Sequence, residues 1–537
     1  MKKIFSLVCL LLSMTIADSQ TRYPIVPYPN KLVEREGDFQ FKSQLLVSFP
    51  VVFKSEFETL KSLFQEEFIQ LIPSGKAKVV VKVNQKIGSE AYILDITQNR
   101  IIIQAATAKG CFYAFQTIRQ LMKMDGLGNY TVPSCQIEDE PAFSYRSYML
   151  DVAKNFQGKE VVEKILDQMA LLKMNVFHWH LTDDSGWRIQ IDKYPLLTQV
   201  GAWRDSTLLI EWKPDPKTGE IKRQNGGWDT DLRGGFYTKS DIREIVKYAS
   251  KRHILVVPEI DMPGHSIAAI AAYPWLSDSG KQLKVSSKNI GITDIALNIA
   301  DEKVYGFIEN VLNEVIELFP GKIIHIGGDE VKFDSWKNRT DVNEMMTKND
   351  LKNFSDLHIY FSNRIAIFLE RKGYRMMGWN EILGNINEDK AEAKANLMLN
   401  PNTIIHYWRG DTILLNQAIE KGYDVVYNKG SDTYLSQPIE VLSLSKAYHL
   451  SPLPKGVSKE HLKHFLGLGV AMWGAITPKV LDVYQYTFPR IAAFAEVAWT
   501  HQENKNYNRF TEGVAKLKKR WDRKGIYYYE GIKPTIR

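Results

Sequence analysis

The sequence contains little cysteine and little net charge. Three of its 537 residues are cysteines. Cys9 lies in the apolar stretch at the start of the chain, and Cys111 and Cys135 could either form a disulfide or remain buried free thiols. No cysteine pattern resembles a metal site. The net charge of +7 is small and dispersed, so we expect no nucleic-acid partner.

Apolar runs long enough to span a membrane are also absent, and only the first residues are strongly apolar. A charged start, Met1 to Lys3, is followed by an apolar run at 4–16 and by small and polar residues at 17–19. This order is typical of a secretory signal peptide, and the run is too short for a spanning helix. Cys9 lies too far inside the run to be a lipid attachment site. We therefore expect residues 1–19 to direct export to the periplasm.

The rest of the chain has an ordinary globular composition and enough length for two or three domains. Residues 22–141 are predicted to form an α+β domain, because strand-like runs at 78–83, 91–97 and 100–105 precede a helical stretch at 107–123. This domain contains no pair of acids and no histidine cluster. We interpret it as a structural or docking domain.

From residue 142 to residue 500, strand and helix patterns alternate regularly. Eight such repeats predict a (β/α)₈ TIM barrel. No glycine-rich phosphate loop follows the first strand, which argues against a dinucleotide-binding sheet. Residues 501–537 are predicted to form a helical extension on the outside of the barrel. The eight predicted strands are residues 145–153, 175–181, 254–260, 323–326, 375–379, 404–408, 424–427 and 467–473.

The fourth predicted strand ends in a pair of adjacent acids. Its apolar residues lead into Gly327 and Gly328, and the carboxylates Asp329 and Glu330 follow at once. Burial of a carboxylate without a partner is costly, so this position needs an explanation. Two acids that simply face water would explain the pair in isolation. Other predicted strands also end in polar or aromatic residues, however, and barrel active sites lie at the carboxyl ends of the strands.

Two histidines on the second predicted strand support a metal-dependent alternative. His178 and His180 are two residues apart, so their side chains point to the same face, as in metal-dependent barrel hydrolases. His265 and His325 could complete a metal site only if the fold brings them close. A buried histidine with satisfied hydrogen bonds explains His178 more simply. We therefore expect no metal and no other cofactor.

Four motifs resemble those of glycoside hydrolase family 20, the β-N-acetylhexosaminidases. The similarity extends over nearly the whole chain after the leader and includes the amino-terminal α+β domain. It implies an exo-acting enzyme that removes terminal β-linked N-acetylglucosamine with retention of configuration. A barrel that only binds sugar is the alternative from another class, and it predicts that the acid at position 330 is lost. The four motifs are Arg146 with 149–153, then 178–184, 258–265 and 325–330.

The adjacent acids suit the substrate-assisted chemistry of this family. Most glycosidases place two carboxyl groups about 5 Å apart or more across the scissile bond, and neighbouring residues can hardly do so. The resemblance implies that the substrate's own 2-acetamido carbonyl attacks the anomeric carbon. Glu330 would protonate the leaving oxygen and then activate water, and Asp329 would hold the acetamido N–H. Asp184 and His265 would tune the proton affinity of Glu330.

The resemblance also assigns the contacts with the sugar. Tyr434 would donate a hydrogen bond to the acetamido oxygen, and Arg146 would bind ring hydroxyls. An aromatic wall would enclose the acetamido methyl group, and it would consist of Trp379, Trp408 and Trp473.

Two positions depart from the pattern of the family. Most relatives carry an aspartate two residues after the tyrosine matched by Tyr434, and a glutamate two residues after the tryptophan matched by Trp473. These acids typically hold the 4- and 6-hydroxyls of the terminal sugar. This chain has Ser436 and Ala475 at the two positions, so two negative charges are missing.

The missing acids allow two interpretations. One is drift, with water in the vacated space. The other is a pocket that accepts an anionic 6-substituent such as sulfate, because like-charge repulsion at about 4 Å is worth roughly 4 kcal/mol at an intermediate dielectric. Lys429 and Gln437 lie close to Ser436 in the sequence, and relatives that accept 6-sulfated N-acetylglucosamine similarly replace the aspartate. We therefore expect the 6-sulfated sugar to be cleaved at least as well as the plain one.

Overall fold

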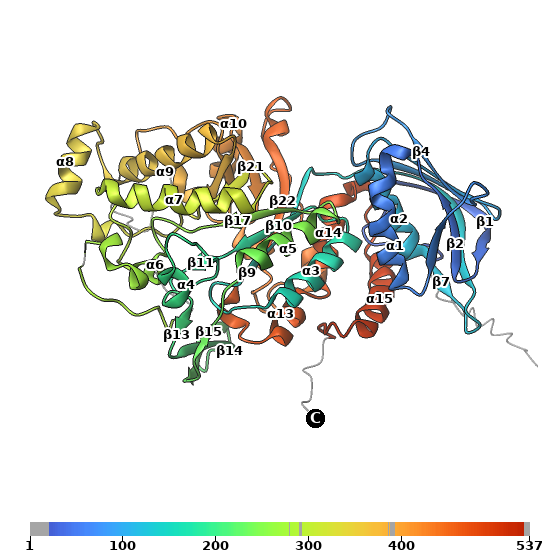
Figure 1. The fold of residues 1–537 in the computed structure, drawn as a ribbon, viewed down its shortest axis with the longest axis horizontal. Coiled ribbons are helices and arrows are strands. Elements are labelled where there is room, and N and C mark those ends of the chain that lie inside the picture. The colour runs from blue at the N-terminus through green and yellow to red at the C-terminus, as the bar shows by residue number, and fades with distance from the viewer. Residues whose placement is uncertain (1–20, 279, 289–292, 385, 387–392, 531–537) are drawn as a thin grey trace, which may run out of the picture.

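The structure is a computed structural model with two lobes (Figure 1). The predicted signal peptide at 1–19 lies outside the described residues, so export stays a prediction. Within the described part of the chain, no helix is both long and apolar enough to cross a membrane. The described residues are 21–278, 280–288, 293–384, 386 and 393–530.

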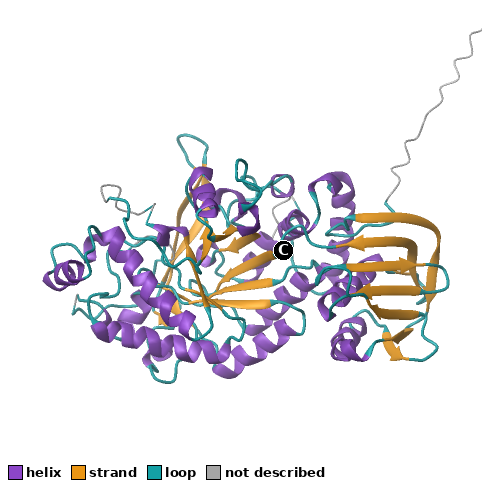
Figure 2. Cartoon of the chain, turned by 90° about the horizontal axis from the view of Figure 1, so that it is seen from above, coloured by secondary structure: helices purple, strands orange, loops and turns teal. Residues whose placement is uncertain are grey.

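The amino-terminal lobe is a mixed β-sheet with helices on one face (Figure 2). Its strands lie in the order β1-β8-β5-β6-β4-β2-β3, and the short β7 pairs with β8. Burial alternates along β5 and β6, as expected where only one face of a sheet packs on a core. The elements are β1 (Lys31–Phe41), β2 (Gln44–Ser48), α1 (Lys54–Gln65), β3 (Gln70–Pro73), β4 (Val79–Val83), β5 (Tyr92–Ile96), β6 (Ile101–Ala105), α2 (Ala108–Leu121), β7 (Lys123–Met124) and β8 (Tyr130–Asp139).

Helix α2 is enclosed between the sheet and the second lobe. All of its residues from Gly110 to Leu121 are buried, and it contacts both the sheet and helix α3 (Lys159–Leu171). Cys111 on α2 and Cys135 on β8 are both buried free thiols, so of the two states open from the sequence the structure shows the unpaired one.

The second lobe is a closed barrel of eight parallel strands, which confirms the predicted fold. Each of the eight predicted strands is present as one strand of the barrel, and β22 pairs with β9 to close it. The strands are β9 (Tyr145–Asp151), β10 (Val176–His180), β17 (Leu255–Glu259), β18 (Ile323–His325), β19 (Arg375–Trp379), β20 (Ile404–Tyr407), β21 (Asp424–Tyr427) and β22 (Phe465–Met472).

Helices cover the outside of the barrel, and shorter helices lie in the connections between its strands (Figures 1 and 2). Besides α3 they are α4 (Leu196–Gln199), α5 (Lys239–Ser250), α6 (Ile267–Ala272), α7 (Glu302–Leu318), α8 (Thr340–Lys348), α9 (Phe354–Arg371), α10 (Thr412–Glu420), α11 (Gly430–Thr433), α12 (Leu444–Tyr448), α13 (Val480–Thr487) and α14 (Arg490–Trp499).

The barrel interior changes from apolar to polar along the strands. Near the amino ends, side chains from six strands form one buried apolar cluster that includes Val176, Val257, Met377 and Ile404. Two residues further on, the same inward face carries polar or aromatic groups, because side chains two apart share a face. These groups are His178, Glu259, Trp379 and His406, and all four are buried.

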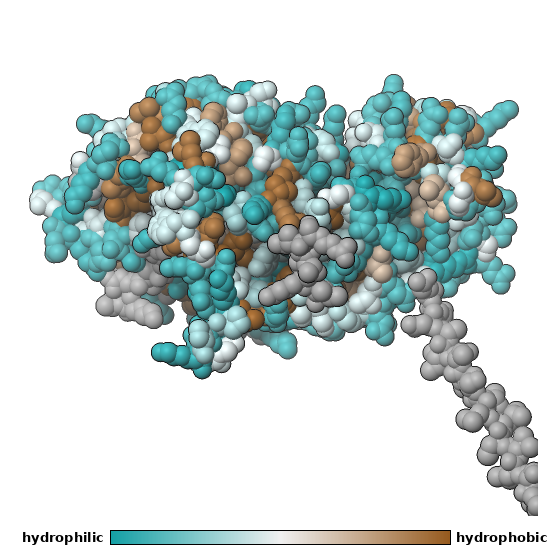
Figure 3. Space-filling view, turned by 90° about the horizontal axis from the view of Figure 1, so that it is seen from below, coloured by the Kyte–Doolittle hydropathy of each residue, from teal (hydrophilic) through white to brown (hydrophobic). Residues whose placement is uncertain are grey.

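The connection after β10 contains a hairpin that the alternating sequence pattern did not reveal. Strands β14 (Thr207–Pro214) and β15 (Ile221–Asp229) pair antiparallel and project from the barrel (Figure 1). The face of the molecule on that side is mostly hydrophilic, with hydrophobic side chains in separate patches (Figure 3). Four short strands flank the hairpin: β11 (Thr182–Asp183), β12 (Gly186–Trp187), β13 (Trp203–Arg204) and β16 (Arg233–Gly234).

The carboxy-terminal helix α15 (Tyr507–Arg523) packs at the junction of the two lobes rather than on the barrel alone. Arg520 forms an ion pair with Glu67 of the first lobe. Trp521 Nε1 donates to Gln168 Oε1 of helix α3 at 3.0 Å. The helix therefore ties the two lobes together.

Candidate active site

A cavity of about 510 Å³ lies at the carboxyl ends of the barrel strands. Its size is within the range of small-molecule pockets, so it can hold a monosaccharide unit. Ten of the twelve site residues predicted from the sequence line it: Asp184, His265, Asp329, Glu330, Trp408, Lys429, Tyr434, Ser436, Gln437 and Trp473. Trp379 lies behind this lining, and Arg146 lies elsewhere.

The two glycines before the acid pair are required by the backbone and by close packing. Gly327 and Gly328 have φ of 67° and 84°, in the region that favours glycine. A Cβ at Gly327 would lie 1.8 Å from Asp261 Oδ1. Glu330 also has a positive φ, 52°, which is strained for a side chain of this kind. The turn after β18 therefore holds Glu330 in one orientation at the cavity.

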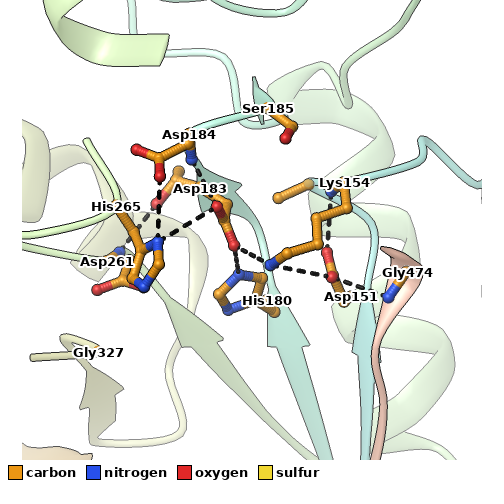
Figure 4. Close-up of polar contacts among 12 residues, drawn as sticks. Asp151, Lys154, His180, Asp183, Asp184, Ser185, Asp261, His265, Gly327 and Gly474 are labelled. Atoms are coloured by element: carbon orange, nitrogen blue, oxygen red, sulfur yellow. Dashed lines mark hydrogen bonds and ion pairs between the residues drawn. The ribbon is translucent and has the colours of Figure 1, made fainter. Parts of the chain in front are cut away.

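His265 lies between the acid pair and a second pair of acids, Asp183 and Asp184, and its contacts with this second pair are drawn in Figure 4. Its Nδ1 is 3.3 Å from Asp184 Oδ2, and its Nε2 is 3.4 Å from Glu330 Oε2 and 3.8 Å from Asp329 Oδ2. Burial alone would lower the pKa of His265, but the charge of Asp183 and the hydrogen bonds to Asp184 and Glu330 raise it well above its usual value. The histidine is therefore an imidazolium that carries a proton beside Glu330.

The adjacent acids have pKa values shifted in opposite directions. Burial raises the pKa of Asp329 to about 7, and the charge of Glu330 adds to the shift against the opposing charge of His265. Burial also acts to raise the pKa of Glu330, but the hydrogen bond and the charge of His265 outweigh it and hold this pKa below its usual value. Pairs whose environments separate their pKa values are typical of acid–base sites.

An aromatic wall forms one side of the cavity. The rings of Trp408 and Tyr434 are parallel, with centroids 6.2 Å apart, and Trp473 lies 5.8 Å from Tyr434. Trp379 packs behind them, 5.9 Å from Trp473, and is 1% exposed. The three tryptophans that were predicted to form a wall therefore lie together with Tyr434, and of the four rings only that of Trp379 lies beneath the surface of the cavity.

Two buried carboxylates fix this wall, and sequence reasoning missed both roles. Trp379 Nε1 donates to Glu259 Oε1 at 2.8 Å, and Trp408 Nε1 donates to Glu381 Oε2 at 2.8 Å. Burial and the charge of Asp329 raise the pKa of Glu381 to about 8. The positions of the two acids in the sequence could have revealed these roles, because Glu259 ends a predicted strand and Glu381 follows Trp379 by two residues.

The histidines of the second strand point into the barrel and contact Glu259. His178 Nε2 and His180 Nδ1 lie 2.8 and 2.6 Å from Glu259 Oε2, and His325 Nδ1 lies 3.2 Å from Oε1. Burial lowers the pKa of His178 to about 4, although Glu259 opposes the shift. His178 is therefore a neutral, buried histidine beside an acid. Neither of its ring nitrogens has a hydrogen bond of good geometry, so the interpretation as a histidine with satisfied hydrogen bonds is not confirmed.

Among the residues that the structure describes, four groups of acids and histidines are close enough to surround a metal ion. Two of them contain Glu259 and lie in the barrel interior, where Glu259 already accepts the Trp379 indole N–H. The other two contain His265, whose Nδ1 and Nε2 already lie 3.3 Å from Asp184 Oδ2 and 3.4 Å from Glu330 Oε2. The geometry thus favours proton chemistry at these groups.

The expectation for Arg146 needs correction. Arg146 is 1% exposed, its Nη2 donates to Glu90 Oε2 at 2.6 Å, and its Nε donates to the Lys173 carbonyl at 2.9 Å. It is the second residue of β9, whereas the cavity lies at the other end of that strand, about 16 Å away for five residues of strand. Arg146 therefore joins the bottom of the barrel to the first lobe and does not touch the sugar site.

Lys154, and not Arg146, is the cation of this segment that lies at the cavity. It lines the cavity just beyond the carboxyl end of β9, pairs with Asp183, and lies 3.5 Å from Asp151 Oδ2 (Figure 4). Its Nζ is 4.7 Å from the centroid of the Trp473 ring. Burial opposes the shift, but Asp151 and Asp183 raise the pKa of Lys154, so the side chain stays charged. It can donate hydrogen bonds to ring hydroxyls.

Further cavity residues come from segments that carried no motif. Trp212 and Arg223 belong to the β14–β15 hairpin, Lys288 follows β17 in a loop, and Arg409 follows β20. Trp212 is 224 residues from Ser436, yet its Nε1 donates to the Ser436 carbonyl oxygen at 3.0 Å. No periodic pattern in the sequence predicts such a contact.

Comparison with known proteins identifies relatives for both lobes. The family model for the catalytic domain of glycosyl hydrolase family 20 matches residues 143–502, and the model for domain 2 of that family matches residues 22–140. A beta-hexosaminidase of Porphyromonas gingivalis is 32% identical over 94% of this chain, and this chain spans 64% of that protein. A beta-hexosaminidase of Vibrio furnissii is 33% identical over 88% of this chain and 76% of its own length.

Solved structures agree with this result. The exo-β-N-acetylglucosaminidase of Vibrio harveyi in complex with N-acetylglucosamine superposes with a TM-score of 0.83 at 28% identity, covering 96% of this chain and 79% of the other. The β-N-acetylhexosaminidase of Bacteroides fragilis gives a TM-score of 0.78 at 28% identity, covering 94% of this chain and 96% of the other.

Proposed function

Because the chain belongs to glycosyl hydrolase family 20, we propose that it is an exo-acting β-N-acetylhexosaminidase that removes terminal β-linked N-acetylglucosamine. The relatives named beta-hexosaminidase support this activity. The observation that carries the proposal is the acid pair, with Glu330 3.4 Å from the imidazolium of His265 and Asp329 in the same cavity as the aromatic wall.

We propose that the reaction is substrate-assisted and retains configuration. The oxygen of the 2-acetamido carbonyl attacks the anomeric carbon while Glu330 gives its proton to the departing glycosidic oxygen. Asp329 accepts the acetamido N–H and offsets the positive charge of the resulting oxazolinium ring. Glu330 then takes a proton from water, the water oxygen bonds to the anomeric carbon, and the ring opens to the product.

The proton relay supports the role of Glu330. The acid must be protonated when the bond breaks, although its pKa in the free site is low. His265 lies 3.4 Å from Glu330 Oε2 and is protonated, and Asp184 on its other side stabilises that charge. The chain Asp184–His265–Glu330 can thus supply the proton to Glu330 and take it back.

Hydrolysis of an aryl β-N-acetylglucosaminide tests this activity. The wild type should release the aryl alcohol, and Glu330→Gln should lower turnover by about 10³-fold, within the range for loss of a general acid. Lack of turnover by the wild type would favour the barrel that only binds sugar. Loss of activity on treatment with EDTA, restored by a divalent metal, would favour the metal-dependent alternative.

We further propose that the enzyme accepts N-acetylglucosamine with a 6-O-sulfate. Ser436 and Ala475, which replace the two acids common in the family, both line the cavity. Lys429 lines it as well, and among the described residues its ammonium group has no ion-pair partner. A cation without an acid is suited to an anionic group on the sugar, and two like-charge repulsions are absent.

Matched plain and 6-sulfated aryl N-acetylglucosaminides test this second proposal. We expect the sulfated substrate to be cleaved at least as well as the plain one. Ser436→Asp restores a negative charge and should impair the sulfated substrate selectively, whereas the isosteric Ser436→Asn should impair it less. Cleavage of the plain substrate only would contradict the proposal, and drift would then explain Ser436 and Ala475.

A further inference from the structure

The β14–β15 hairpin covers the end of the cavity where the two family acids are missing. Trp212 Nε1 donates to the carbonyl oxygen of Ser436 at 3.0 Å. Strand β14 also contacts the short 3₁₀ helix Gly474–Ile476, which contains Ala475. At its base, the Leu208 amide donates to the Ser287 carbonyl at 2.8 Å. The hairpin thus contacts both positions at which the family acids are missing, Ser436 directly and Ala475 through its short helix.

One cation on this hairpin faces the cavity without an acidic partner. Arg223 is the cross-strand partner of Trp212, its Cζ lies 5.7 Å from the Trp212 ring centroid, and both residues line the cavity. The neighbouring hairpin lysines are neutralised locally, since Lys213 lies 2.5 Å from Glu211 and Lys222 lies 3.1 Å from Glu220. Within the described chain, Arg223 has no such ion pair.

The charges around the cavity are divided between two sides. The acids cluster around His265, at the ends of β10, β17 and β18. Arg223 and Lys288 lie on the hairpin side, where Leu208 bridges to Lys288, and neither forms an ion pair among the described residues. An anionic substituent on the sugar would be attracted to the hairpin side and repelled by the acids, which orients the substrate.

We infer that Arg223 is a specificity-determining residue that binds the anionic 6-substituent, while Trp212 closes the cavity over the same end of the sugar. This inference rests on the proposed acceptance of 6-sulfated N-acetylglucosamine. The planar guanidinium presents paired N–H donors that match the oxygens of a sulfate, and the Trp212 ring beside it limits its orientations. Trp212 itself is held by its hydrogen bond to Ser436.

Arg223→Gln tests the inference, with Lys222→Gln as the matched control on the same strand. Arg223→Gln should lower kcat/KM for the 6-sulfated aryl substrate about 10- to 100-fold, the scale of a lost charge-assisted hydrogen bond, and change the plain substrate less than about threefold. Lys222→Gln should leave the ratio of the two substrates unchanged. Arg223→Lys should retain part of the preference, because it keeps the charge but not the planar donors.

The outcomes separate this inference from the proposals on which it rests. A wild type that cleaves neither substrate contradicts the proposed activity, and one that cleaves only the plain substrate contradicts acceptance of sulfate, so either result also overturns the inference. A wild type that cleaves the sulfated substrate, with an unchanged substrate ratio in Arg223→Gln, overturns the inference alone. Activity of the variant on the plain substrate shows that it is folded.

Discussion

Both ends of the barrel bury charged groups, but the charges are balanced at one end and crowded at the other. At the amino end, Arg146 pairs with Glu90, and Lys173 Nζ lies 2.9 Å from Asp139 Oδ2, with both side chains fully buried. At the carboxyl end, Lys154 pairs with Asp183, and His265 lies 3.3 Å from Asp184 and 3.4 Å from Glu330. Five acids line the cavity there: Asp183, Asp184, Asp261, Asp329 and Glu330.

This difference separates a structural charge from a functional one. Burial opposes ionisation of Glu90, yet Arg146 and Lys109 hold its pKa below the usual value, so the acid is a satisfied anion. Burial and neighbouring acids instead raise the pKa values of Asp261, Asp329 and Glu381. A buried charge alone therefore does not mark an active site, whereas a cluster of acids with strongly shifted pKa values does.

The largest effect is expected from removal of a charge at the crowded end. Asp329→Asn should lower kcat by about two orders of magnitude or more, because it removes an aligned electrostatic stabiliser of the oxazolinium charge. Binding of the product N-acetylglucosamine should change much less. Steady-state kinetics and product inhibition measure the two effects, and near-normal turnover would show that Asp329 does not assist the acetamido group.

A pair of variants, one near each end of strand β9, compares the two ends of the barrel directly. Lys154→Met should raise KM about tenfold or more, because the cavity loses a charged donor to the sugar. Arg146→Met should leave kcat and KM of the folded enzyme unchanged but lower the free energy of unfolding by about 1–3 kcal/mol, because the buried Glu90 loses one of its two cationic partners and keeps Lys109. Kinetics and denaturant unfolding of both variants check this, and a kinetic defect in folded Arg146→Met would restore it to the site.

A smaller but distinctive effect is expected in the pH profile. The active site needs one proton on the acid pair, so kcat/KM should fall below the lowered pKa of Glu330, where both acids are protonated, and above about pH 7, where Asp329 also ionises and its charge holds the remaining proton on His265 instead of Glu330. In Asp329→Asn, Glu330 titrates alone, so the alkaline limb should move to lower pH. An alkaline limb that stays near pH 7 in this variant would assign that limb to another group.

The barrel and most of the site residues could be predicted from the sequence alone. Strand and helix alternate with clear periods, and the carboxyl ends of parallel strands meet at one edge, so Asp184, His265 and Glu330 could be placed together without a structure. Arg146 was misplaced because it was judged by its motif and not by the end of the strand on which it lies.

The remaining features depend on contacts that no local pattern encodes. Trp212 meets Ser436 only through folding of the hairpin across the barrel mouth. Glu259 and Glu381 act through hydrogen bonds to indoles of other strands or turns. The roles of such residues can be assigned only when the distances between segments far apart in the sequence are known.

Participation of the substrate's acetamido group is the central claim, and one comparison of donors tests it most directly. The purified wild type should be assayed with aryl β-N-acetylglucosaminide and aryl β-glucoside that share one leaving group. We expect the glucoside to be cleaved at least 10³-fold more slowly, because its 2-hydroxyl cannot supply the internal nucleophile, whose effective molarity is on the order of 10⁵ M or more. Efficient cleavage of both substrates would contradict the account, because a side chain of the protein would then have to act as the nucleophile.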